Sequence, residues 1–113
     1  MFNRGPAIPT VEVEQLPADG YLLDVREDDE WECGHAPEAV HVPMSEIMAR
    51  VEEVPADRQV YVICKVGGRS AQVVGFLNGQ GRETVNVAGG MLAWAAAGRP
   101  MVAGQPGADP FVA

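Results

Sequence analysis

The chain has 113 residues, of which 47% are hydrophobic and 21% are charged, and its formal net charge is −8. This length and composition predict one globular domain with its own core rather than a disordered chain. The eight basic residues are scattered among sixteen acidic ones and form no basic patch, so we expect no nucleic-acid binding.

The first half of the chain is predicted to alternate short strands with short helical segments. Residues 1–9 carry two prolines and a glycine, which predicts an irregular arm. The alternation over residues 10–13 predicts an edge strand, followed by a helical turn near residues 14–16. The apolar run 21–25 is typical of a strand buried on both faces, and the acidic cluster 27–30 favours the start of a helix.

The middle of the chain repeats this pattern. Residues 39–42 predict a short strand closed by Pro43, and Ser45 is predicted to cap an amphipathic helix over residues 46–51. The β-branched run 60–63 predicts a buried strand. A helix is then predicted to open at Ser70 and to end near Gly79 and Gly81.

The last part of the chain completes the fold class. Residues 84–87 predict a strand, and residues 91–97 a helix that ends at Gly98 and Pro100. Strands alternating with helices predict an α/β domain over residues 10–102, with a small, mainly parallel sheet of about five strands and helices on both faces. Residues 103–113, rich in Gly, Pro and Ala, are predicted to form a loose or loosely docked tail.

The sequence also predicts where the protein works. The N-terminus lacks the apolar core of a secretory signal, and no apolar run approaches the roughly 20 residues of a membrane helix. Cys33 and Cys64 are too few for a disulfide framework and form no metal-binding motif. We therefore expect a cytoplasmic protein with no membrane contact and with Cys64 unbridged.

The stretch around Cys64 gathers the residues capable of chemistry. Cys64 ends the most apolar predicted strand, and parallel sheets place their sites at such ends. The N–H groups of the following loop and of the helix start can converge on one point, because Gly67 and Gly68 tolerate a close backbone approach. Together with Lys65 and Arg69, they would lower the thiol pKa from its free value of roughly 8.5. The alternative is a buried, inert cysteine.

The segment from Cys64 to Ser70 resembles the active-site loop of the single-domain rhodaneses, which are sulfurtransferases that carry a sulfane sulfur on a cysteine. Other segments resemble the same family in the same order, namely residues 23–27, 30–31, 34–43, 87–94 and 98–100. The resemblance therefore covers roughly residues 10–102 and is specific rather than a chance match to one short motif. It implies a rhodanese-like fold.

The resemblance implies that Cys64 takes sulfur from a small anionic donor such as thiosulfate and passes it from a persulfide to a thiophilic acceptor, cyanide or a thiol. A protein could also serve as donor or acceptor, and neither metal nor organic cofactor is needed. The residues implied to bind the donor and to hold the outer sulfur are Lys65, Val66, Gly67, Gly68, Arg69 and Ser70. Asp24 and Arg26 match a family motif and are expected to support the loop from behind.

Other functions and roles stay open. The chain could be a persulfide carrier or regulatory module that a partner protein loads. A cysteine-based phosphatase or arsenate reductase is less favoured, because the four residues between Cys64 and Arg69 make a smaller ring of N–H groups than the five-residue loop of dual-specificity phosphatases. Lys65 and Arg69 could be solvated surface charges, and Asp24 and Arg26 a plain surface ion pair.

Four aromatic or imidazole side chains and one further cysteine are given structural roles. The expected structural residues are Trp31, His35, His41 and Trp94. Cys33 could form a disulfide with Cys64 under oxidation, but an incidental cysteine is the better interpretation. The sequence leaves the oligomeric state open.

Overall fold

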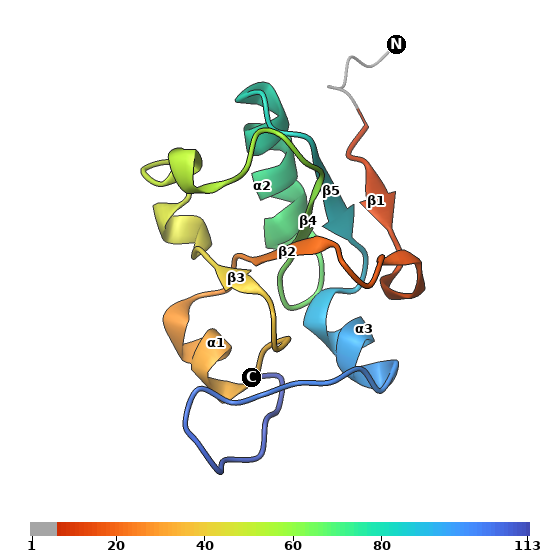
Figure 1. Ribbon diagram of the computed structural model, residues 1–113, viewed down its shortest axis with the longest axis vertical. Coiled ribbons are helices and arrows are strands. Elements are labelled where there is room, and N and C mark those ends of the chain that lie inside the picture. Colours follow the sequence, from red (N-terminus) through yellow and green to blue (C-terminus); the bar gives the residue numbers. More distant parts are fainter. Residues whose placement is uncertain (1–6) are drawn as a thin grey trace.

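A five-stranded sheet forms the centre of the protein (Figure 1), which we describe from a computed structural model covering residues 7–113; the first six residues of the predicted arm lie outside the described range. The strand order is β1-β5-β4-β2-β3, and every neighbouring pair is parallel. The strands are β1 (Thr10–Val11), β2 (Tyr21–Asp24), β3 (Val40–His41), β4 (Val60–Ile63) and β5 (Thr84–Val87). The predicted α/β fold is confirmed, with both edge strands shorter than expected.

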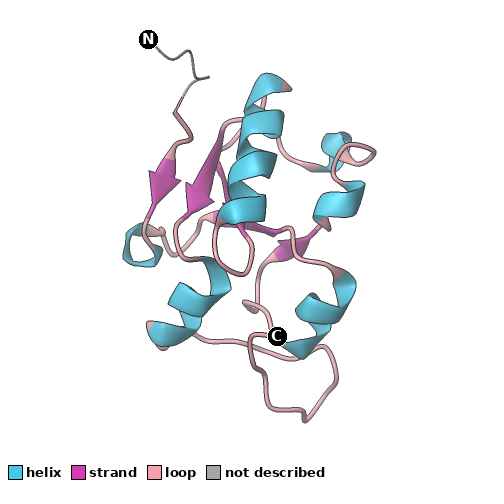
Figure 2. Cartoon of the chain, turned by 180° about the vertical axis from the view of Figure 1, so that it is seen from behind, coloured by secondary structure: helices cyan, strands magenta, loops and turns pink. Residues whose placement is uncertain are grey.

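Helices cover both faces of the sheet, as predicted. The α-helices are α1 (Asp28–Cys33), α2 (Gly68–Gly79) and α3 (Gly90–Ala96), and the 3-10 turns are η1 (Val13–Gln15), η2 (Met44–Glu46) and η3 (Val51–Glu53). Seen from behind, α2 lies in front of the sheet (Figure 2), whereas α3 and η1 pack on the opposite face. No helix within residues 7–113 is long and apolar enough to cross a membrane.

The alternation of side chains along β4 divides the core into two parts. Val60 and Val62 point into the cluster beneath α2, and Ile63 points into the cluster beneath α3. Cys64 follows in the same alternation, so its side chain belongs to the α2 side. Each fully buried Val or Ile contributes about 1.5–3 kcal/mol relative to exposure, which fixes the strand and therefore the direction in which the cysteine points.

Helix α2 begins two residues earlier than the predicted start at Ser70. Gly67 has a φ of 113° and precedes the helix as its N-cap, so Gly68 and Arg69 already lie in the first turn. Ser70 instead opens the buried stripe of the helix, which continues with Val73, Val74 and Leu77 at helical spacing. The hydroxyl of Ser70 is thereby directed into the protein rather than used as a cap.

The prediction of a helix over residues 46–51 is wrong. The chain forms the 3-10 turns η2 and η3 there, and Arg50 between them leaves helical geometry with a φ of −118° and a ψ of 24°. Ser45 is not an N-cap, because its hydroxyl donates to Glu27 Oε1 at 2.8 Å. A segment of this length has little helical stability of its own, so the burial of Ile47 and Val54 in the α2 core decides its path.

The C-terminal segment runs back along α1, below the sheet in Figure 1. Val102 pairs with His35 in an isolated antiparallel bridge. Farther along, the N–H groups of Gly104 and Phe111 donate to the carbonyls of Glu32 and Cys33 at 2.9 and 3.0 Å. The end of the chain therefore makes backbone contacts with the carboxyl end of α1.

Candidate active site

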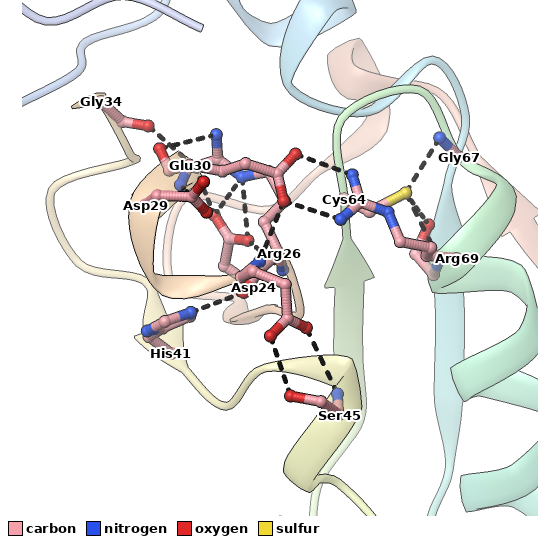
Figure 3. A network of polar contacts seen from close by, with 12 residues as sticks. Asp24, Arg26, Asp29, Glu30, Gly34, His41, Ser45, Cys64, Gly67 and Arg69 are labelled. Atoms are coloured by element: carbon pink, nitrogen blue, oxygen red, sulfur yellow. Dashed lines mark hydrogen bonds and ion pairs between the residues drawn. The ribbon is translucent and has the colours of Figure 1, made fainter. Parts of the chain in front are cut away.

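The sulfur of Cys64 lies fully buried where β4 ends and α2 begins, surrounded by hydrogen-bond donors (Figure 3). The N–H groups of Gly67 and Ser70 lie 3.1 and 3.4 Å from Sγ, and the Ser70 hydroxyl lies 3.2 Å from it. The left-handed conformation of Gly67 turns the loop back over the sulfur. The predicted convergence of N–H groups is therefore present in the folded chain.

Helix α3 holds the same loop from the other side. The N–H of Met91 donates to the carbonyl of Cys64 at 2.8 Å, and that of Leu92 donates to the carbonyl of Lys65 at 3.1 Å. These carbonyls are thereby turned away from the sulfur, which leaves the N–H groups of the loop to face it. Gly90 makes this contact feasible, because a Cβ at that position would overlap both carbonyl oxygens.

The surroundings of Cys64 shift its thiol toward the ionised form. Burial raises the pKa of the thiol, but hydrogen bonds from the Ser70 hydroxyl and from the N–H groups of Ser70, Gly67 and Val66 lower it by more. The net effect is a Cys64 pKa below its ordinary value. Because the thiolate is the nucleophilic form of cysteine, these surroundings favour Cys64 Sγ as a nucleophile.

The two predicted cations of the loop have different surroundings. Arg69 makes a bidentate ion pair with Glu30 of α1, with N–O distances of 2.7 and 2.9 Å (Figure 3). This pair lowers the pKa of Glu30 to about 2 and raises that of Arg69. Lys65 has no ion-pair partner among residues 7–113. Arg69 is thus largely neutralised, and Lys65 carries the unpaired positive charge.

Asp24 and Arg26 form a completely buried ion pair, which excludes the surface-pair alternative. Arg26 donates twice to Asp24 Oδ2 and once to Oδ1 through its guanidinium, and also to the carbonyls of Glu30 and Gly34 in and after α1. The pair therefore supports α1, and α1 in turn presents Glu30 to Arg69. Its link to the loop runs through Glu30 rather than through direct contact.

Two residues of this network, Glu30 and Asn86, were not predicted as site residues. Asn86 Oδ1 accepts a hydrogen bond from the Ser70 hydroxyl at 2.6 Å. The alternation of β5 places Asn86 on the same face as Cys64, so a polar residue in a buried strand was an available signal. Glu30 lies in the acidic cluster that predicts the start of a helix and in a segment that resembles the family, but neither signal predicts its contact with Arg69.

The aromatic and imidazole side chains that were predicted to be structural make contacts within the protein. His35 and His41 stack on the two sides of Trp31, with ring centroids 3.5 and 4.5 Å from its own. Trp94 is buried and donates to the Pro100 carbonyl at 2.9 Å. Cys33 is a free, half-buried thiol. Within residues 7–113 no group of three or more His, Cys, Asp or Glu side chains could hold a metal ion.

A separate cavity of about 250 Å³ lies on the α3 side of the sheet. Its walls include Tyr61, Trp94, Arg99 and Pro100 and none of the residues from Cys64 to Ser70. This cavity therefore does not border the loop around the sulfur, whose exposed residues are Val66 and Gly68.

Comparisons with known proteins agree with this geometry. The rhodanese-like domain family matches residues 10–97. The Bacillus subtilis protein YtwF is 44% identical over 89 residues, covering 77% of this chain and 86% of that protein, and a sulfurtransferase of Allochromatium vinosum is 42% identical over 86 residues, covering 75% and 80%. The crystal structure of a rhodanese-related protein from Thermoplasma volcanium superposes with a TM-score of 0.79 at 32% identity, covering 83% of this chain and 97% of that one. The chain belongs to the rhodanese-like sulfurtransferase family.

Proposed function

We propose that the protein is a sulfurtransferase that works through a persulfide on Cys64. The observation that carries this proposal is a buried cysteine sulfur surrounded by N–H donors from a loop with four residues between Cys64 and Arg69. A ring of this size suits one additional sulfur atom better than a tetrahedral phosphate. A reducing compartment such as the cytoplasm would keep the thiol available.

The proposed cycle has two displacement steps. The Cys64 thiolate attacks the outer sulfur of thiosulfate, the donor's S–S bond breaks, and sulfite leaves with the electron pair. The acceptor, which is cyanide or a thiol in its thiolate form, then attacks the outer sulfur of the Cys64 persulfide. The S–S bond that formed in the first step breaks, thiocyanate or a new persulfide leaves, and the Cys64 thiolate is restored. Dividing the transfer in this way replaces one difficult step with two easier ones.

The loop would stabilise the charged intermediate. Gly68 and Arg69 belong to the first turn of α2, whose N–H groups have no acceptor within the helix. Together with those of Val66, Gly67 and Ser70, they could donate to the outer persulfide sulfur, which carries the negative charge. Lys65 would attract an anionic donor to the loop from solution.

A second candidate is a persulfide carrier that receives sulfur from a partner protein. The observation that favours it is the ion pair of Arg69 with Glu30, which leaves Lys65 alone to attract a doubly charged donor. Beside Lys65, Val66 and Leu92 are 59% and 45% exposed. Such an apolar margin suits contact with another protein surface better than contact with a small anion.

Intact-protein mass spectrometry after incubation with thiosulfate tests the proposal. We expect a mass gain of one sulfur atom that disappears on adding cyanide. The gain should persist in a Cys33→Ser variant and vanish in Cys64→Ser, since a serine hydroxyl is not ionised at neutral pH. Loading of Cys64 with sulfur only from a persulfide-bearing cysteine desulfurase would favour the carrier. Sulfur retained by Cys64→Ser would overturn the assignment, and so would hydrolysis of an aryl phosphate by a protein that takes up no sulfur.

A further inference from the structure

Three buried polar groups form a line that ends at the catalytic sulfur. Cys64 and Ser70 are fully buried, and Asn86 is 7% exposed. The Ser70 hydroxyl lies 3.2 Å from Cys64 Sγ on one side and 2.6 Å from Asn86 Oδ1 on the other. Beside the N–H groups of Gly67 and Ser70, the Ser70 hydroxyl is the side-chain group hydrogen-bonded to the sulfur, and its partner on the far side is the uncharged amide of Asn86.

The fold sets these three residues side by side. Cys64 follows β4, and Asn86 lies in the neighbouring β5, opposite Val62 in the parallel register. Ser70 opens the buried stripe of α2, which covers the same face of the sheet. Two adjacent strands and the helix that connects them therefore supply all three groups.

The hydroxyl of Ser70 has only one hydrogen to share between its two neighbours. When Cys64 is a thiol, its S–H donates to Ser70 Oγ, and the Ser70 O–H donates to Asn86 Oδ1. When Cys64 is a thiolate, the sulfur can only accept hydrogen bonds, so the Ser70 O–H turns toward it and adds to the N–H groups of Gly67 and Ser70. Asn86 Oδ1 would then face the hydroxyl oxygen without a hydrogen between them, a costly arrangement in a buried site.

A primary amide resolves this conflict, because a half-turn of the side-chain amide replaces the acceptor Oδ1 by the donor Nδ2. We propose that Asn86 is a positioning residue whose amide turns when Cys64 loses its proton, so that Nδ2 donates to Ser70 and Ser70 donates to the sulfur. The same order of donors would serve the persulfide anion; only that extension rests on the proposed function.

Other charges near Cys64 do not provide this reversal. They are Lys65 in the loop, Arg69 of α2, Glu30 of α1 and the Asp24–Arg26 pair at the end of β2. Residues of α3 and β5 add no titratable group at this end of the sheet. These charges favour or oppose the thiolate as a whole, whereas Asn86 acts on it only through Ser70.

The test is a spectroscopic titration of the Cys64 thiolate in a Cys33→Ala background. Asn86→Asp replaces the amide, which can turn, by a carboxylate that can only accept and therefore keeps the Ser70 O–H away from the sulfur. We expect the Cys64 pKa to rise by about one unit, which makes the thiolate fraction about tenfold smaller near neutral pH. In a Ser70→Ala background the same substitution should raise it by less than half as much, because only its charge remains to act. Asn78→Asp makes the same chemical change at the other end of α2 and should leave the pKa unchanged.

Equal shifts with and without Ser70, or no shift, would overturn the proposal. Should Asn86→Asp not fold, NMR of the otherwise unaltered Cys33→Ala chain decides the matter: the side-chain ¹⁵N resonance of Asn86 should titrate together with Cys64 and should cease to do so in Ser70→Ala. A resonance that ignores the ionisation of Cys64 would refute the turn of the amide. Neither measurement uses a sulfur donor, so failure of the proposed sulfur transfer would leave both results interpretable.

Discussion

Lys65 supplies the positive charge that adjoins Cys64 in the chain. Lys65 is the only lysine in the sequence, and it adjoins Cys64 in a chain whose net charge is −8. Arg69, the other cation of the loop, is held by both oxygens of Glu30. If the proposed function holds, an anionic donor that approaches the loop would be attracted mainly by Lys65, because the charge of Arg69 is offset by Glu30.

We expect Lys65→Gln to raise the KM for thiosulfate by about three- to tenfold with a smaller change in kcat, because an attraction of about 1 kcal/mol acts mainly on donor binding. Steady-state kinetics at low and high salt measure this, and the effect should shrink as salt screens the charge. Arg50→Gln makes the net charge equally more negative but removes an arginine paired with Glu46 and Glu53, so its KM should stay close to that of the unaltered chain. Equal effects of the two variants would assign the attraction to net charge.

Residues of the loop could be predicted from the sequence because their spacing alone places them around Cys64. The partners Glu30 and Asn86 could not, since they lie 39 residues from Arg69 and 16 residues from Ser70 along the chain. Only the order of the strands and the position of α1 bring them to the loop. The fully buried state of Asp24 and Arg26 has the same origin, and the sequence left a surface pair open as the less favoured alternative.

At the scale of elements, the start of α3 and the loop after β4 form one unit. Met91 and Leu92 hold the loop carbonyls, and Gly90 provides the close approach at a φ of 55°. The sequence predicted both elements within one or two residues, because strong glycine and apolar signals delimit them. Their contact depends on the sheet between them and was not predictable. In residues 44–53, by contrast, core packing overrode a weak helical pattern.

Gly90→Ala should therefore displace the loop and slow alkylation of Cys64 at neutral pH by at least tenfold, since its Cβ would overlap the carbonyl oxygens of Cys64 and Lys65. Gly98→Ala is the matched control: Gly98 also has a positive φ, of 72°, but a Cβ there meets nothing within 4 Å. It should cost about 1 kcal/mol of backbone strain and leave the alkylation rate unchanged. Both rates can be followed by mass spectrometry, and indistinguishable rates would show that the loop does not depend on α3.

At the scale of the whole molecule, α1 is held by polar contacts. None of its residues is buried, yet it receives donors from Arg26 and Arg69 and accepts the backbone of the C-terminal segment. The ion pair of Glu30 with Arg69 depends on the ionisation of the Glu30 carboxyl, whereas the backbone contacts and the two apolar cores do not. The stability of the protein should therefore respond to acid mainly through this helix.

Glu30 gives that response a sign and a range. Its folded-state pKa of about 2 lies below its ordinary 4.5, so its contribution is complete above about pH 4.5 and is lost as the pH falls through about 2. We expect Glu30→Gln to lower the free energy of unfolding by about 1–2 kcal/mol at pH 6, allowing for solvent screening at the partly exposed Arg69, and by much less at pH 2.5. Urea unfolding at both values measures this. Glu53→Gln removes one partner of an exposed pair with Arg50 and should show a far weaker pH dependence; a pH-independent effect of Glu30→Gln would contradict the argument.

The two-residue strands at the margins of the sheet have a consequence for crowded solutions. β1 and β3 each share only two residue positions with their neighbours before the chain turns away, into η1 on one side and to Pro43, which has no N–H, on the other. A second molecule that tried to lengthen the sheet would find almost no ladder to continue. Within the described residues, the edges of the sheet therefore disfavour strand-to-strand pairing between copies of this chain.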